Sequence, residues 1–185
     1  MVLVLGILLA LMVGVALWAM GIYNGLVALR NQVKNAWSQI DVQLKRRHDL
    51  IPNLVQTVKG YAGHERETLE SVIAARARAV SAQGVQEQSQ AEQGLSGALG
   101  RLMLVVEQYP DLKANQNFLS LQEEITSTEN RIGFSRQHYN DSVMTYNTRI
   151  QKFPDNVVAG NFSFTAENFF ELQEEAAREA PKVSF

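Results

Sequence analysis

The most concentrated apolar pattern lies at the start of the chain. In residues 2–23 every position is apolar except three glycines, and no charged side chain occurs before Arg30. A helix rises ~1.5 Å per residue, so this run reaches ~33 Å, enough to cross the ~30 Å hydrocarbon layer of a bilayer. The alternative is a cleaved signal peptide, which needs basic residues before a shorter apolar core and small residues at the cleavage site. Met1 directly precedes the run and residues 18–20 make a poor cleavage site, so we predict a transmembrane helix.

After this segment, apolar residues recur at helical spacing in two neighbouring seven-residue tracks, which together form one apolar stripe. No Gly or Pro occurs between residues 26 and 51, so we expect the membrane helix to continue into the next domain. Pro52 should kink this helix because its ring removes a backbone donor, and Gly60 and Gly63 should end it. One track contains Leu26, Val33, Ile40, Leu54 and Tyr61, and the other contains Trp37, Leu44, Ile51 and Val58.

Three further helices are predicted. Residues 64–82 form the second, and residues 95–109 form the third, which Pro110 stops. The polar segment 81–93 is either a loop or a solvated helix start. The side chain of Asn115 can cap the fourth helix. In that helix, large residues recur at steps of seven with small residues between them, which is typical of a coiled-coil packing seam. The large members are Phe118, Ile125, Ile132, Tyr139, Tyr146 and Phe153, and the smaller track is Leu121, Thr128, Ser135 and Ser142.

These patterns predict an all-α protein, because no run between residues 30 and 153 alternates with the period of a strand for long enough. We expect an N-terminal transmembrane helix that continues into an antiparallel, up-down four-helix bundle with an irregular C-terminal tail. The predicted divisions are residues 1–25 for the anchor, 26–153 for the bundle and 154–185 for the tail.

Arg47 interrupts the apolar stripe of the first long helix. Matching heights along two antiparallel helices places Glu129 close to it, so we predict that Arg47 and Glu129 form a buried polar pair. The alternative is that Arg47 extends its guanidinium to water.

Charges that follow the apolar run predict its orientation. Cations outnumber carboxylates up to residue 50, which places that side of the span in the cytoplasm and the N-terminus outside. Trp18 and Tyr23 fit the aromatic belt at a membrane interface. The cations are Arg30, Lys34, Lys45, Arg46 and Arg47, against Asp41 and Asp49.

Composition narrows the chemistry. The 17 Lys and Arg against 19 Asp and Glu give a formal net charge of −2, which provides no overall basic field, and we predict no nucleic-acid partner. The absence of Cys excludes disulfides and Cys/His zinc clusters. His64-Glu65 begins like a zinc-peptidase motif, but Thr68 stands where the second His is required. We therefore predict no catalytic, cofactor-binding or metal-ligating residues and no enzyme activity.

A long stretch of the chain carries a family resemblance. Residues 36–62, AWSQIDVQLKRRHDLIPNLVQTVKGYA, resemble the signature of the bacterial LemA family. The matches continue in the family's order with YPDLKANQNF, TENRI, YNTRI, Phe153-Pro154 and FFE. The resemblance implies a membrane-anchored, mostly helical bundle without an established reaction. A distant relative of the family takes part in shaping magnetosome membranes, and the genes of members commonly lie near those of membrane-bound zinc metallopeptidases.

Small residues at the membrane boundary favour self-association. Gly21 and Gly25 form a GxxxG pattern, and Gly14 and Ala10 continue it at similar steps. Such residues let helices approach closely in lipid, so we predict Gly14, Gly21 and Gly25 as helix-packing positions. The alternative is simple tolerance of glycine in a membrane helix.

The tail after Pro154 combines aromatic and acidic residues. Phe162, Phe164, Phe169 and Phe170 are predicted to contact the bilayer interface or a neighbouring subunit, and docking onto the chain's own bundle is the alternative. Phe185 belongs to the same aromatic set. The acidic side chains would suit the basic flank of an adjacent chain; they are Glu167, Glu171, Glu174, Glu175 and Glu179.

Together these features predict a scaffold of the bacterial cytoplasmic (inner) membrane, whose partners are membrane lipid and further copies of itself. The alternative is a non-enzymatic adaptor or regulator of a membrane-bound zinc metallopeptidase.

Overall fold

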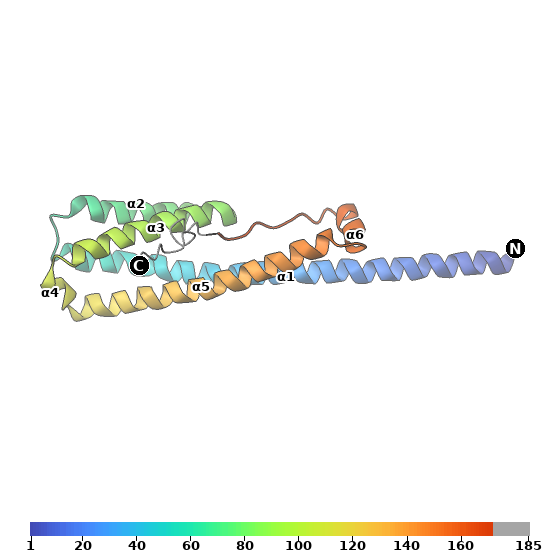
Figure 1. The fold of residues 1–185 in the computed structure, drawn as a ribbon, viewed down its shortest axis with the longest axis horizontal. Coiled ribbons are helices and arrows are strands. Elements are labelled where there is room, and N and C mark those ends of the chain that lie inside the picture. The colour runs from blue at the N-terminus through green and yellow to red at the C-terminus, as the bar shows by residue number, and fades with distance from the viewer. Residues whose placement is uncertain (172–185) are drawn as a thin grey trace, which may run out of the picture. The chain divides into compact units, whose positions relative to one another are not determined.

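The computed structural model describes residues 1–171, and this part of the chain contains helices and no strand. The predicted all-α class is therefore confirmed (Figure 1). The helices are α1 (Val2–Lys59), α2 (Arg66–Ser81), α3 (Gly84–Val106), α4 (Pro110–Lys113), α5 (Gln116–Gln151) and α6 (Asp155–Asn161).

The chain divides into two compact units. Among the described residues, the anchor unit contains Met1–Ile40 and Ser135–Asn168, and the bundle unit contains Asp41–Phe134 and residues 169–171. The long helices α1 and α5 each contribute a part to both units. The divisions expected after residues 25 and 153 stay predictions.

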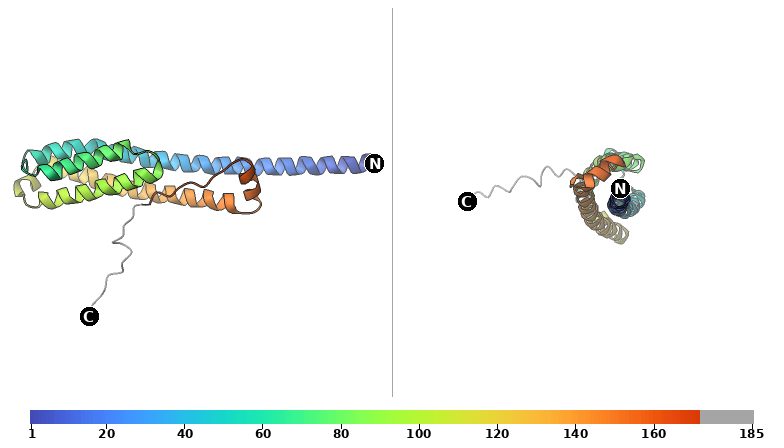
Figure 2. Two further views of the ribbon diagram at one scale, coloured as in Figure 1. Left: turned by 90° about the horizontal axis from the view of Figure 1, so that it is seen from above. Right: turned by 90° about the vertical axis from the view of Figure 1, so that its right-hand side faces the viewer.

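The bundle unit contains the end of α1, the whole of α2 and α3, the short α4 and the beginning of α5. Helices α2 and α3 lie side by side in both long views (Figures 1 and 2). Only Ala82 and Gln83 separate them, and such short turns join antiparallel neighbours. The apolar core of this unit includes Ile51, Leu54, Val58, Leu69, Val72, Leu95, Leu102, Leu112 and Phe118.

The apolar stripe predicted for the first long helix is buried or partly buried except at Tyr61, which lies beyond the end of α1 and is 45% exposed. Leu26, Ile40 and Leu54 of one track are fully buried, as are Ile51 and Val58 of the other. Full burial of such a side chain contributes about 1.5–3 kcal/mol, so the stripe explains why this helix packs where it does.

The end of α1 lies where the glycines predict it. The helix stops at Lys59, directly before Gly60. A Cβ at Gly63 would lie 3.2 Å from the carbonyl oxygen of Lys59, which is a close approach that favours glycine in this turn. Pro52 lies inside α1, which continues beyond it, and the kink there stays a prediction.

The polar segment 81–93 is a helix start and not a loop, because α3 begins at Gly84. Gly84 has a φ of 78°, a conformation that L side chains rarely adopt. At the next boundary, Asn115 caps α5 as predicted: its Oδ1 accepts a hydrogen bond from the backbone N–H of Phe118 at 3.0 Å.

The large residues that recur at steps of seven in the fourth predicted helix are buried, with one exception beyond the end of α5. Phe118, Ile132, Tyr139 and Tyr146 are at most 3% exposed, whereas Phe153 is 82% exposed. The expectation that Phe153 completes the packing seam is wrong. Its seven-residue spacing ceases to matter because α5 ends at Gln151, and beyond a helix end the period no longer fixes the direction of a side chain.

The tail contains one short helix, α6, followed by an irregular segment. We call residues 162–171 the tail segment. Within the anchor unit, residues 162–168 return along α5 (Figure 1). Val158, Ala159 and Phe164 are buried, and these apolar contacts fix the fold of α6 and of the chain that follows it.

Candidate functional site

The first part of α1 exposes its apolar side chains. The most apolar window of this helix has no residue buried inside the structure, and its length and composition suit a membrane span. Exposed side chains include Leu3, Leu9, Met12, Leu17 and Trp18. In water such a surface would be costly, whereas in a bilayer it meets apolar chains. The structure therefore contains one candidate membrane helix among the described residues, near the N-terminus.

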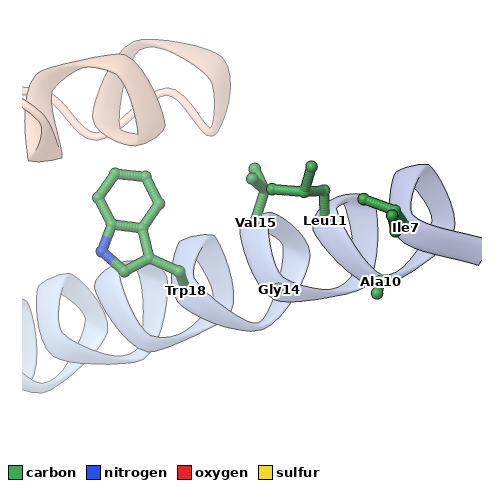
Figure 3. Close-up of a pocket in the computed structure, with 6 residues that line it drawn as sticks. All are labelled: Ile7, Ala10, Leu11, Gly14, Val15 and Trp18. Carbon is green, nitrogen blue, oxygen red and sulfur yellow. The ribbon is translucent and has the colours of Figure 1, made fainter. Parts of the chain in front are cut away.

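A shallow apolar groove runs along this exposed helix surface. Figure 3 shows Ile7, Leu11, Val15 and Trp18 as projecting side chains, with Gly14 between them. A Cβ at Gly14 or Gly21 would meet nothing within 4 Å, so no contact within the described chain requires glycine at either position. At Gly25 a Cβ would lie 3.9 Å from Nη2 of Arg149, which is ordinary contact. The helix-packing role of these three positions stays a prediction.

A cluster of charged side chains lies inside the bundle unit. Arg47 on α1 and Glu92 on α3 are 2% and 1% exposed, and Nη1 of Arg47 lies 3.4 Å from Oε2 of Glu92. Oε1 of the same carboxylate lies 2.7 Å from Nε2 of His48, which is also buried. One carboxylate thus joins two neighbouring residues of α1. We call Arg47, His48, Glu92, Ser96 and Glu129 the buried charge cluster.

The remaining members complete the partners of Arg47. Its Nη2 donates to Oγ of Ser96 at 2.7 Å, and its Nη1 lies 3.2 Å from Oε2 of Glu129. The side chain of Glu129 is 44% exposed, so this carboxylate meets water as well. A buried guanidinium without a carboxylate would be strongly destabilising, and here it has two.

Two further side chains hold the cluster in place. Gln88 donates to Oε1 of Glu92 at 2.9 Å, and Nε of Arg76 donates to the backbone carbonyl of His48 at 2.7 Å. The cluster therefore ties α1 to α2, α3 and α5 within the bundle unit. A groove of about 350 Å³ opens beside it, and its lining includes Arg47, Ser96, Gly100, Thr126, Glu129 and Asn130.

Arg47 and Glu129, which the sequence predicts to be a pair, lie in contact in the structure. The alternative, in which Arg47 reaches water, is wrong because this side chain is 3% exposed. The role of Glu92 was not predicted from the sequence, because this residue lies in a Gln-rich segment that has no apolar periodicity. The only available signal was its place three residues before Leu95, which puts both on one helix face.

Hydrogen bonds to backbone atoms fasten the tail segment in the anchor unit. The hydroxyls of Tyr139 and Tyr146 donate to the carbonyls of Asn168 and Thr165 at 2.8 and 3.0 Å. Asn147 makes two bonds to the backbone of Glu167, one from its Nδ2 to the carbonyl and one to its Oδ1 from the N–H, both at 2.9 Å. We call Tyr139, Tyr146 and Asn147 the tail clasp.

The environment of the clasp changes its acidity. Burial, assisted by the carboxylate of Glu167, raises the pKa of Tyr139 to about 12. The same two causes raise the pKa of Tyr146, and Arg30 opposes them in part. Both hydroxyls therefore stay protonated donors throughout the physiological range.

The four predicted tail phenylalanines divide into two pairs. Phe164 and Phe170 are buried within the described chain, as the docking alternative expected, whereas Phe162 and Phe169 are 59% and 41% exposed. The Tyr23 ring lies 4.8 Å from that of Phe162 and 5.6 Å from that of Phe164. Arg30 stacks over Phe164 at 5.1 Å. Contact of the exposed pair with a bilayer or a neighbouring subunit stays a prediction.

The acidic tail prediction falls partly outside the described residues. Glu174, Glu175 and Glu179 lie there, as does Phe185. Within the described chain, the backbone carbonyl of Glu171 accepts a hydrogen bond from Ser89 of α3. The predicted attraction to an adjacent chain therefore stays untested.

The described residues contain no group of three or more His, Asp or Glu side chains that could hold a metal ion. His64 is exposed just before α2, and Glu65 accepts a hydrogen bond from the hydroxyl of Tyr109 at 3.2 Å. The partial zinc-peptidase motif thus belongs to the loop and first turn of a helix.

Comparison with known proteins agrees with this architecture. The chain is similar to the magnetosome protein MamQ 2 of Paramagnetospirillum magneticum, with 28% identity over 88% of this chain and 68% of the relative. It is also similar to the protein LemA of Metamycoplasma hominis, with 32% identity over 74% of this chain and 63% of that relative. The match to the LemA family covers residues 36–185. This chain belongs to the LemA family.

Proposed function

We propose that this chain is a single-pass membrane-anchored scaffold that self-associates and organises or shapes the bilayer. The observation that carries the proposal is the exposed apolar part of α1, which continues without interruption into the helix that the bundle unit buries. An apolar helix surface that residues 1–171 leave uncovered calls for lipid or another molecule to cover it. The bilayer satisfies that requirement along the full length of the run.

Relatives support the membrane association in the proposal. Two of the similar proteins are magnetosome proteins, MamQ 2 of Paramagnetospirillum magneticum and MamQ of Magnetospirillum gryphiswaldense. Each match extends over 88% of this chain. A common fold does not transfer a function, and the proposal therefore depends on a direct test.

Self-association would use the surface that α1 leaves open. Gly14 and Gly21 have free space around them, so a second helix can approach the α1 backbone closely there. The bacterial cytoplasmic membrane is the proposed location, with the N-terminus outside and the bundle unit in the cytoplasm, because the cations follow the span. Alkaline phosphatase fused after Phe185 should be inactive, and a periplasmic activity would reverse this orientation.

The size of the full-length protein in mild detergent tests the proposal. A scaffold forms large homo-oligomers alone, whereas an adaptor of a membrane-bound peptidase stays small until its partner is present. We expect large particles by size-exclusion chromatography with light scattering, and deformed vesicles by electron microscopy after reconstitution. Monomers together with unchanged vesicles would refute the scaffold and favour the adaptor.

A matched pair of variants sharpens this test. Gly14→Leu together with Gly21→Leu fills the open surface of α1 and should reduce oligomer size. Gly97→Ala, at a position that also has open space around it, should leave oligomer size unchanged. A second comparison is truncation after Glu171, which retains the tail clasp. Truncation after Asp155 would remove the residues that Tyr139, Tyr146 and Asn147 hold, so it would confuse assembly with folding.

A further inference from the structure

Helix α6 and the residues on either side of it expose large apolar side chains. Phe153 is 82% exposed, Phe162 is 59% exposed and Val157 is 54% exposed. We call these three residues the α5–α6 corner. Neighbouring Val158, Ala159 and Phe164 are buried, so this part of the chain is well packed and its exposed side chains are not simply unfolded. Apolar side chains this prominent on one short helix and its two flanks call for a partner.

The α5–α6 corner lies beside the end of the apolar run of α1. The ring of Phe162 packs 4.8 Å from that of Tyr23, the last residue of the run. Helix α5 approaches the run from the opposite direction, and Nη2 of Arg149 lies 3.9 Å from a Cβ placed at Gly25. Residues after Arg149 therefore reach the level at which the run ends. Both long views show α6 next to α1 there (Figures 1 and 2).

We propose that the α5–α6 corner is a second membrane contact, in which Phe153, Val157 and Phe162 rest in the boundary between lipid headgroups and acyl chains. The proposal rests on the membrane anchor proposed above. It commits to lipid because Phe162 packs against Tyr23, at the end of an apolar helix surface that the described residues leave uncovered, and because Trp18 and Tyr23 fit the aromatic belt of a membrane interface.

Charge at the corner is compatible with lipid headgroups. Arg149 pairs with Asp155, which leaves the exposed Lys152 next to Phe153 as the nearby cation. An aromatic side chain flanked by a lysine is a common arrangement at membrane interfaces, because the ring enters the apolar edge while the ammonium meets phosphate. With two contacts, the bilayer fixes the depth of α1 and also its rotation about its own axis.

Site-directed spin labelling of the full-length protein in vesicles tests this contact. The chain has no Cys, so each introduced Cys carries the only label. F153C and V157C replace exposed side chains and spare the core. M144C is the matched control, because Met144 is 56% exposed on α5 within the same unit but farther from the run. L11C reports on insertion of α1 itself.

We expect the labels at 153 and 157 to collide more often with oxygen, which concentrates in lipid, than with a water-soluble nickel complex. The ratio of the two collision rates should be several-fold higher than at 144 and lower than at 11. Equal ratios at 153, 157 and 144, with a high ratio at 11, would overturn the second contact and leave the anchor intact. An aqueous ratio at 11 would instead overturn the anchor and this proposal with it.

The same labels distinguish lipid from a neighbouring copy of the chain. Contact between copies at the corner would broaden the spectra of F153C, and dilution with unlabelled protein would remove the broadening. That result would overturn the lipid proposal. Spectra that do not change on dilution, combined with a high oxygen ratio, would support it.

Discussion

In the bundle unit, the charged or titratable side chains of Arg47, His48 and Glu92 are buried inside the fold, whereas in the anchor unit the side chains that hydrogen-bond to the tail segment are neutral. Arg47 needs two carboxylates and a hydroxyl in fixed positions, supplied by two other helices, α3 and α5. Tyr139, Tyr146 and Asn147 need only backbone atoms, which every residue offers. Polar side chains are therefore satisfied in two ways. In the bundle unit they need particular side chains as partners, and in the anchor unit they bind backbone atoms, which any residue can supply.

The two regions also differ in the free energy that is lost when one polar partner is removed. An unpaired buried charge costs several kcal/mol, whereas a missing neutral hydrogen bond costs about 0.5–1.5 kcal/mol. The buried charge cluster should therefore be the more sensitive of the two regions to single substitutions, and the tail clasp the more tolerant.

The largest expected effect follows from Glu92→Leu. This substitution leaves Arg47 with only the half-exposed Glu129 and removes the partner of His48, so the free energy of unfolding should fall by about 3 kcal/mol or more. Urea unfolding of the detergent-solubilised protein, followed by circular dichroism, measures it. Glu124→Leu is the control, because the pair of Glu124 with Arg46 is exposed at 3.6 Å and should contribute at most about 1 kcal/mol. Equal losses in the two variants would contradict the comparison.

High pH should act on the anchor unit. The folded state raises the pKa of Tyr139 to about 12, so it binds this proton more tightly than the unfolded chain does. The stabilisation is complete below pH 10 and is lost as the pH rises from 10 to 12, because a tyrosinate cannot donate to the carbonyl of Asn168. The ultraviolet absorbance of tyrosinate, together with protease cleavage in the tail segment, follows the transition. Tyr139→Phe should remove the step near pH 12, while Tyr146 still titrates above its usual pKa, and an unchanged titration curve would assign that step elsewhere.

A smaller loss is expected from Tyr139→Phe at neutral pH. The substitution keeps the ring, which packs 5.4 Å from that of Trp37, and removes one neutral donor, so stability should decrease by about 1 kcal/mol. Thermal unfolding measures the change. Tyr61→Phe is the control, since the hydroxyl of Tyr61 only accepts an exposed hydrogen bond from Asn115. A loss as large as that of Glu92→Leu would remove the distinction between the two regions.

The smallest effect is the coupling between Arg47 and Glu129. A double-mutant cycle with Arg47→Met and Glu129→Gln should give an interaction energy of about 0.5–1 kcal/mol, because water screens the half-exposed carboxylate. The corresponding cycle with Glu92→Gln should give a larger value, because that carboxylate is buried. Strict additivity for Glu129 would show that the 3.2 Å contact contributes nothing to stability.

Much of the fold could be predicted from the sequence because the spacing of apolar residues indicates where amphipathic helices form. The two apolar tracks of α1, the cap at Asn115 and the end of α1 before Gly60 are local signals, and the structure confirms them. Phe153 shows where period fails, since the same spacing continues past the last residue of α5.

The candidate sites were harder to predict because they depend on which helices meet. Arg47 was visible as a charge in an apolar stripe, and height matching along two long helices reached Glu129. Glu92 was not visible, because nothing in a Gln-rich segment states which face of α3 is buried. The partners of the tail clasp are backbone atoms of an irregular segment. Because every residue has the same backbone atoms, the residue types do not indicate which of them a side chain will bind.

The tail clasp has a consequence for how this protein can change over time. Because Tyr139, Tyr146 and Asn147 recognise main-chain atoms alone, they place little restriction on the identity of residues 165–168, where Thr165, Ala166 and Asn168 face outward. Mutations can accumulate at these positions without loosening the attachment. We therefore expect the sequence of this stretch to vary among related proteins. It is also a suitable place to introduce a short epitope by substitution.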